Sequence, residues 1–253
     1  MKKLILLEHL SKITKQPKEN IAPMLTSIFI SLYGASGSGG RFGSANIPFE
    51  YSDLFLWNSP AKDMNEDIYK TLEKYVASLP RAFKKGEEPI RNLYLWSANP
   101  GNGKTSSAVA LLNEFMFVGY RVSLATKSPQ KLPAAYFFDV NEFQTLYNTF
   151  NRQGIAEEVS KPASITYYDM MTSAKEAPLV VFDDIAVRSA TEAFRADLHS
   201  VINFRVANNK PSIYTSNKPI GELKTVFDER LYDRVNSNAL KIEFKGVSQR
   251  GAK

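Results

Sequence analysis

The chain contains 253 residues, 43% of them hydrophobic and 23% charged, a balance that excludes an intrinsically disordered protein. It contains no cysteine, which excludes disulfides and thiolate metal sites, and its two histidines, His9 and His199, are far apart in the sequence, so we predict no structural zinc. The net charge of +6 favours a polyanionic partner.

The first 33 residues are predicted to form two short helices. Residues 21–33 contain no charged side chain, and apolar residues recur at helical spacing before them. Two small helices bury little surface alone, so we expect them to dock on a partner or on the main domain. No run reaches the roughly 18 apolar residues of a membrane span, which predicts a cytoplasmic protein without a membrane partner. The first apolar stripe consists of Leu4, Leu7, Leu10 and Ile13.

Residues 34–46 are rich in glycine and serine, a composition typical of a flexible linker. Residues 34–41 resemble a phosphate-binding loop but lack its Lys-Ser/Thr pair, so they are assigned to the linker. We therefore predict a helical docking segment at 1–33, a linker at 34–46 and a main domain at 47–253.

In the main domain, the first predicted helix runs from Asp63 and ends before Pro80. Residues 93–96 then form an apolar run of strand length, followed by a Gly/Pro/Asn loop and a helical pattern. Strand, glycine loop, Gly-Lys-Thr and helix are the context of a phosphate-binding loop. Ala98 stands where the motif usually has its first glycine, which weakens the match without breaking it.

Each part of this loop has a chemical role. Gly101 and Gly103 let backbone N–H groups turn towards phosphate oxygens, and the helix N-terminus adds partial positive charge. Lys104 would reach the β- and γ-phosphates of ATP, and the Thr105 hydroxyl would ligate Mg²⁺. The predicted nucleotide-binding residues of the loop are Asn99, Pro100, Gly101, Asn102, Gly103, Lys104, Thr105 and Ser106.

Two strands are expected at residues 121–125 and 135–138, before a helix capped by Asp139 and Glu142. A later helix, capped by Ser189 and Glu192, is expected to run through residue 202. The first of these helices carries an apolar stripe of Phe143, Leu146, Tyr147 and Phe150.

Residues 179–182 form a buried type of strand that ends in Asp183 and Asp184, the Walker B arrangement. Asp183 would hold Mg²⁺ and Asp184 would orient the attacking water. Strands at 212–215, which ends near Asn217, and at 240–244 follow. Strands that alternate with helices predict an α/β fold with a parallel sheet, whose carboxyl ends gather the ligand site.

With these motifs placed, the chain resembles the DnaC/DnaI helicase-loader branch of the AAA+ ATPases and the related IstB proteins. The resemblance implies an AAA+ P-loop NTPase core with a parallel five-stranded sheet, a small helical N-terminal appendage and no full C-terminal lid. The residues that carry it are 45–48 (Ala-Asn-Ile-Pro), 101–105 (Gly-Asn-Gly-Lys-Thr), 182–185 (Phe-Asp-Asp-Ile), 215–217 (Thr-Ser-Asn), 233–235 (Asp-Arg-Val) and 246–250 (Gly-Val-Ser-Gln-Arg).

The resemblance also implies roles for single residues. Asn217 is similar to sensor 1, Arg250 to sensor 2, and Arg234 to the arginine finger that reaches into a neighbour's ATP site, with Arg230 as the alternative. A finger implies self-association in the ATP form. Single-stranded DNA would bind at Tyr147, Phe150 and Arg152, although both aromatic residues also complete an apolar stripe.

The function that follows is an ATPase, slow and stimulated by partners, that binds single-stranded DNA and loads a hexameric replicative helicase during initiation. One alternative is an IstB-like ATPase that regulates a transposase, and another is a DNA adaptor with weak hydrolysis. A small-molecule kinase is disfavoured because the sequence has no Arg-rich lid. In addition, a kinase would not need the sensor-like Asn217.

Overall fold

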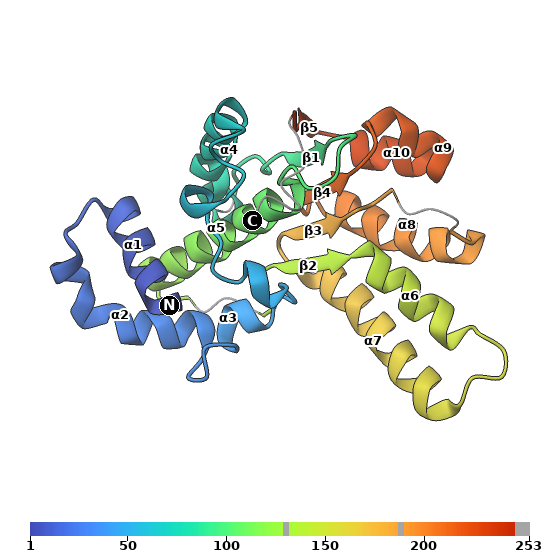
Figure 1. The fold of residues 1–253 in the computed structure, drawn as a ribbon, viewed down its shortest axis with the longest axis horizontal. Helices are drawn as coiled ribbons and strands as arrows, with labels where there is room; N and C mark the ends of the chain where they lie inside the picture. Colours follow the sequence, from blue (N-terminus) through green and yellow to red (C-terminus); the bar gives the residue numbers. More distant parts are fainter. Residues whose placement is uncertain (85, 129–131, 187–189, 246–253) are drawn as a thin grey trace.

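The computed structural model describes residues 1–84, 86–128, 132–186 and 190–245, which form a five-stranded parallel sheet with helices on both faces (Figure 1). The strand order is β2-β3-β4-β1-β5, and every neighbouring pair is parallel. The predicted α/β class and five-stranded parallel sheet are confirmed. The strands are β1 (Asn92–Trp96), β2 (Tyr136–Asp139), β3 (Val180–Asp183), β4 (Ser212–Ser216) and β5 (Ala239–Glu243).

Alternation along the strands creates two apolar cores, one on each face of the sheet. Leu93 and Leu95 face the core beneath α5, whereas Tyr94 between them faces the core beneath α7 and α8. The helices are α1 (Lys2–Thr14), α2 (Lys18–Tyr33), α3 (Gly40–Gly43), α4 (Glu66–Ser78), α5 (Lys104–Thr126), α6 (Val140–Phe150), α7 (Glu157–Glu176), α8 (Glu192–Ala207), α9 (Leu223–Val226) and α10 (Glu229–Asn236), with 3₁₀ turns η1 (Phe49–Tyr51), η2 (Leu56–Asn58), η3 (Leu79–Phe83) and η4 (Ile220–Glu222).

Helix α5 is longer than predicted, and the expected strand at 121–125 is wrong because those residues form its last turns. The alternation of Val122 and Leu124 imitates a strand, but extending an existing helix adds one backbone hydrogen bond per residue without a partner strand. The helix ends at Lys127, which has a left-handed φ of 52°. Helix α5 is long and apolar enough to cross a membrane by length and composition, yet 67% of its most apolar window is buried inside the protein.

The N-terminal helices pack on the main domain, which was one of the two expectations for residues 1–33. Leu6, His9 and Leu10 of α1 are buried, whereas Leu4 of the predicted stripe is 71% exposed. Leu7, Leu10 and Ile13 of the predicted stripe pack on the core, and His9 joins them by stacking on Phe55 with ring centroids 3.8 Å apart.

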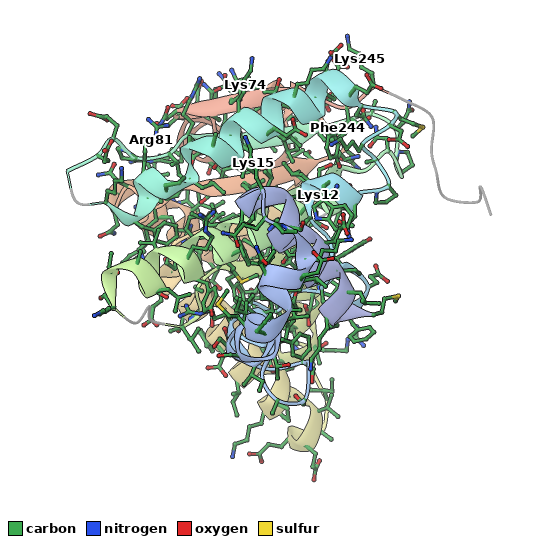
Figure 2. All side chains as sticks on the ribbon, turned by 90° about the vertical axis from the view of Figure 1, so that its left-hand side faces the viewer. Lys12, Lys15, Lys74, Arg81, Phe244 and Lys245 are labelled. Carbon is green, nitrogen blue, oxygen red and sulfur yellow. The ribbon has the colours of Figure 1, made fainter. Side chains whose placement is uncertain are left out.

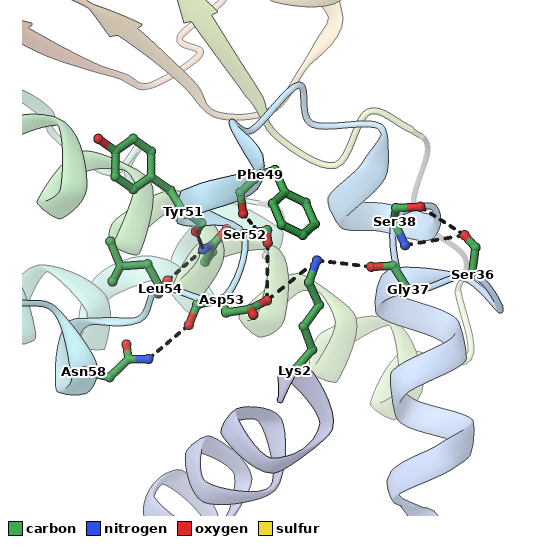
Figure 3. A network of polar contacts seen from close by, with 11 residues as sticks. Lys2, Ser36, Gly37, Ser38, Phe49, Tyr51, Ser52, Asp53, Leu54 and Asn58 are labelled. Atoms are coloured by element: carbon green, nitrogen blue, oxygen red, sulfur yellow. Dashed lines mark hydrogen bonds and ion pairs between the residues drawn. The ribbon is translucent and has the colours of Figure 1, made fainter.

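A polar network also ties α1 to η1 (Figure 3). The Lys2 ammonium donates to Gly37 O at 3.1 Å and lies 3.7 Å from Asp53 Oδ1. Its ammonium also lies 4.9 Å from the centroid of the Phe49 ring. The start of the chain is thus joined to Gly37 and to the residues in and just after η1.

The predicted linker at 34–46 packs on the domain instead of running free. It contains α3, and the Phe42 ring stacks on Tyr33 at 4.5 Å between centroids. Phe137 N donates to Ala45 O over 2.8 Å, so the segment lies beside β2. Composition indicated flexibility, but the apolar Phe42 and Ala45 supply the burial that orders the segment.

Three helix starts can be compared with the predicted ones. Asp139 caps α6 as predicted, accepting hydrogen bonds from Asn141 N and Glu142 N. Helix α4 begins close to the predicted Asp63, after N-cap Asn65. The cap of α8 is Thr191, which accepts from Phe194 N, and not Ser189, which lies outside the described residues.

Helix α7, which the sequence analysis missed, forms with α6 a hairpin that extends away from the sheet (Figure 1).

Arg205 is a fully buried cation that joins α7 to the amino ends of two strands. Its guanidinium donates to carbonyl oxygens at the end of α7, where the helix dipole is negative. Burial lowers its pKa to about 9. Its acceptors are Ser212 Oγ, Ala174 O, Ala177 O, Pro178 O and Pro211 O.

Candidate nucleotide-binding site

The loop between β1 and α5 has the conformation that its glycines were predicted to permit. Gly101 and Gly103 have φ values of 76° and 96°, in the left-handed region. A Cβ atom on Gly103 would lie 2.1 Å from the Ala61 Cβ. Glycine is therefore required at position 103 both for its positive φ and because a side chain has no room there. The loop delivers Lys104 and Thr105 to the first turn of α5.

Two residues of the loop shape it from within. Asn102 is fully buried, and its amide donates to Ser97 Oγ and, over 3.1 Å, to Phe244 O. Its side chain therefore anchors the loop to the end of β5. Lys104 Nζ donates to Asn99 O and to Asn102 Oδ1, each at 3.3 Å, which holds the ammonium beside the loop.

A cavity of about 430 Å³ lies at the carboxyl ends of the strands, and most of the predicted site residues line it. Asn99 and Asn102 do not line this cavity. Four lining residues, Tyr51, Pro60, Asn141 and Thr215, were not among the predicted site residues. The predicted residues that it brings together are Pro100, Gly101, Gly103, Lys104, Thr105, Ser106, Asp183, Asp184 and Asn217.

Asp183 lies at the centre of a hydroxyl–carboxylate cluster. Thr105 Oγ1 donates to its Oδ1 over 2.9 Å, and Thr215 Oγ1 donates to the same oxygen over 2.6 Å. Burial raises the pKa of Asp183 to about 6, and the hydrogen bonds from Thr215 and Thr105 oppose that rise. Carboxylate and hydroxyl oxygens are hard donors that suit Mg²⁺, which commonly takes one or two protein ligands together with phosphate oxygens and water. Thr105 and Asp183 fit that requirement.

Asp184 adopts a left-handed backbone, with φ of 53°, that turns the chain after β3. Its Oδ2 accepts a hydrogen bond from Asn141 Nδ2 at 3.2 Å. Asn141 belongs to the first turn of α6, so the second Walker B carboxylate is tied to the α6–α7 hairpin. The sequence offered a signal for Asn141, because it is the second residue after the Asp139 cap at the end of β2.

Two of the predicted arginines, Arg230 and Arg234, do not line this cavity. Arg234 and Arg230 of α10 are both exposed, and neither lines it. Arg250, the predicted sensor 2, lies outside the described residues, as does the 246–250 pattern. Among the described residues of one chain, the site therefore contains Lys104 but neither Arg230 nor Arg234.

The predicted DNA-binding aromatics belong largely to an apolar cluster. Tyr147 and Phe150 are half-buried, and both rings pack near Tyr167, at centroid distances of 5.8 and 5.2 Å. Arg152, just beyond α6, is exposed. The packing supports the alternative that both aromatics complete the stripe of α6.

No protein-family model matches the chain. The chain is similar to the replicative helicase loader DnaC of Escherichia coli (strain K12), with 23% identity over 181 residues that cover 70% of this chain. The match spans 65% of the length of that relative, under two thirds.

Solved structures share the fold. The structure of DnaI superposes with a TM-score of 0.56 and 19% identity, over 83% of this chain and 99% of that one. A replication initiator DnaA bound to AMPPCP and single-stranded DNA gives a TM-score of 0.51 and 16% identity, over 79% of this chain and 51% of that one. The chain therefore has the AAA+ fold, and the resemblance to DnaC and DnaI is confirmed.

Proposed function

We propose that this protein is an ATP-dependent loader of a hexameric replicative helicase that also binds single-stranded DNA. The observation that carries the proposal is the arrangement of Lys104, Thr105 and two consecutive aspartates around one cavity at the carboxyl ends of a parallel sheet. The similarity to DnaC supports the helicase as the partner. A role in replication would place the protein in the cytoplasm.

In this proposal the loop binds the phosphates of ATP and the carboxylates act on water. Lys104 leaves its carbonyl acceptor on Asn99 for the β- and γ-phosphates, and the N–H groups of the loop and of α5 surround the phosphate oxygens. Thr105 and Asp183 would hold Mg²⁺, which neutralises phosphate charge when it is bound. Asp184 and Asn217 then orient the attacking water.

We expect hydrolysis to be slow and stimulated by partners. Aspartate is one methylene shorter than the glutamate that many relatives use, and the carboxylate of Asp184 is engaged by Asn141. In addition, no described arginine lines the cavity, so the finger is expected from a neighbouring subunit. The exposure of Arg234 and Arg230 supports self-association in the ATP form with either residue as the finger.

Two surfaces are candidates for macromolecular partners. Exposed Met24 and Ile30 of α2 remain free of the core, which supports docking of the helicase on the N-terminal helices. Single-stranded DNA is expected at the α6–α7 hairpin, with Arg152 on its backbone. Figure 2 shows basic side chains on another face, including Lys15 just after α1, Lys74 of α4 and Arg81 of η3, which adds to the attraction for a polyanion.

The test is a pull-down in which the tagged protein is mixed with a purified hexameric helicase or with an IstB-partner transposase, with Mg-ATP and without nucleotide. We expect ATP-dependent capture of the helicase. Capture of the transposase alone would favour the IstB-like alternative. Capture without any effect of ATP, together with undetectable hydrolysis, would favour the DNA adaptor.

A further inference from the structure

Thr215 contacts both Walker B aspartates, although the sequence analysis gave it no role of its own. It lies near the end of β4, next to β3 in the sheet, and is 2% exposed. Its Oγ1 donates to Asp183 Oδ1 over 2.6 Å and accepts from Asp184 N over 2.9 Å. One hydroxyl thus bridges the carboxylate of one aspartate and the backbone of the next.

These two hydrogen bonds act on different parts of the site. The donated bond sets the rotation of the Asp183 carboxylate, whose other hydroxyl partner is Thr105. The accepted bond holds the peptide N–H of Asp184, where the backbone takes a φ of 53°. A non-glycine residue in the left-handed region persists only where its surroundings hold it.

The backbone of Thr215 reinforces the same turn. Its carbonyl accepts from Ile185 N over 2.9 Å, so the two consecutive N–H groups after Asp183 both donate hydrogen bonds to Thr215 of β4. The register pairs Phe182 with Tyr214, which places Thr215 directly beside Asp183. Valine at position 215 would keep the shape and the strand preference but leave Asp184 N without its acceptor.

We propose that Thr215 is a positioning residue of the site: its hydroxyl holds Asp183 towards Thr105 and holds Asp184 in the conformation that presents its carboxylate to the cavity. The role in catalysis rests on the proposed function. The positions of the two aspartates can be tested without nucleotide, so the positioning role of Thr215 and the proposed function can be refuted independently.

The experiment compares Thr215→Val and Thr215→Ser with Tyr214→Phe, which removes a hydroxyl from the adjacent residue of β4 that faces the opposite core. Calorimetry with ATP is run in Mg²⁺ and in EDTA. We expect Thr215→Val to weaken Mg-ATP binding about tenfold, as for the loss of one hydrogen bond to a charged group, with ATP binding in EDTA unchanged. Thr215→Ser should restore Mg-ATP binding to within about twofold, and Tyr214→Phe should bind as the wild type.

A crystal structure of nucleotide-free Thr215→Val is the second readout. We expect Asp184 to leave the positive-φ region and Asp183 to rotate away from Thr105. Retention of both geometries, or Mg-ATP binding by Thr215→Val at the wild-type affinity, would overturn the proposal. If Thr215→Val fails to fold, Thr215→Ala takes its place in both readouts, and Thr215→Ser remains the control that retains the hydroxyl. Failure of the wild type to bind ATP would refute the proposed function but leave the geometric test intact.

Discussion

His9 Nε2 of α1 lies 3.5 Å from Glu114 Oε2 of α5, inside the contact between the N-terminal helices and α5. Both side chains are buried, and Leu56 N donates to Glu114 Oε1 at 3.4 Å. Burial raises the pKa of Glu114 to about 7 and lowers that of His9 to about 3. Both groups are therefore driven towards their neutral forms.

The first prediction concerns the pH dependence of stability. Because folding raises the pKa of Glu114, this residue contributes to the free energy of unfolding as long as it is protonated. The contribution is fully present below the unfolded pKa of 4.5 and is lost as pH rises through about 7. Glu114→Gln imitates the protonated form. The difference in the free energy of unfolding between this variant and the wild type should therefore grow in favour of the variant between pH 5 and pH 8, to about 3 kcal/mol at most. Urea unfolding across this range, with exposed Glu73→Gln as the control, measures it. Parallel stability curves for Glu114→Gln and the wild type would contradict the assignment.

The second prediction concerns the phosphate loop. Lys104→Ala should weaken ATP binding by about 10- to 100-fold, because a charged hydrogen bond to the phosphates is lost. Lys241→Ala, which removes an exposed lysine from β5, serves as the charge-matched control. Isothermal titration with Mg-ATP is the measurement, and equal affinities of the two variants would refute the loop as the phosphate site.

The third prediction concerns the finger. Arg234→Ala should bind ATP normally but hydrolyse it about 1,000-fold more slowly, because the guanidinium acts on the neighbour's phosphates. Mixing Arg234→Ala with Lys104→Ala should recover part of the activity, since one supplies an intact ATP site and the other an intact arginine. If hydrolysis recovers when Arg230→Ala is mixed with Lys104→Ala, but not when Arg234→Ala is mixed with it, the finger is Arg230.

The fourth prediction concerns helicase docking. Deleting residues 1–40 would remove buried core residues such as Leu6 and Leu32, so substitutions on the exposed surface give a sharper test. Met24→Glu with Ile30→Glu should abolish capture of the helicase while the melting temperature and Mg-ATP affinity stay unchanged. Val159→Glu, on exposed α7, is the control. Undiminished capture by the α2 variant would place the docking surface elsewhere.

The fifth prediction separates packing from DNA binding at the hairpin. Arg152→Ala should weaken binding to single-stranded DNA and reduce the salt slope by about 0.7, the value for one phosphate contact. Phe150→Leu should lower the melting temperature, because the ring packs near Tyr167 and Tyr168. Fluorescence anisotropy over a salt series and thermal melting measure the two effects. An unchanged slope for Arg152→Ala would remove this residue from the DNA surface.

The sequence by itself determined the local features of the candidate nucleotide site. Strand 93–96, the glycines of the loop, the Asp139 cap and the aspartates after residue 182 were all predictable, because each depends on backbone preferences or on neighbours a few residues away. The parallel sheet followed from the alternation of strands and helices. Local pattern failed at 121–125, where helix propagation prevailed over β-favouring residues, and at 34–46, where burial of Phe42 prevailed over composition.

Only the tertiary structure decided which distant residues meet. The order β2-β3-β4-β1-β5 places Thr215 beside Asp183, although 32 positions separate them in the sequence, and brings Asn141 to Asp184 across 43 positions. The same holds for His9, which packs on Phe55 and Glu114 through contacts between separate helices and turns. Such contacts depend on the whole sheet order and on which helix faces are buried, and the free energy that selects them is spread over many apolar side chains, so no short stretch of sequence contains it.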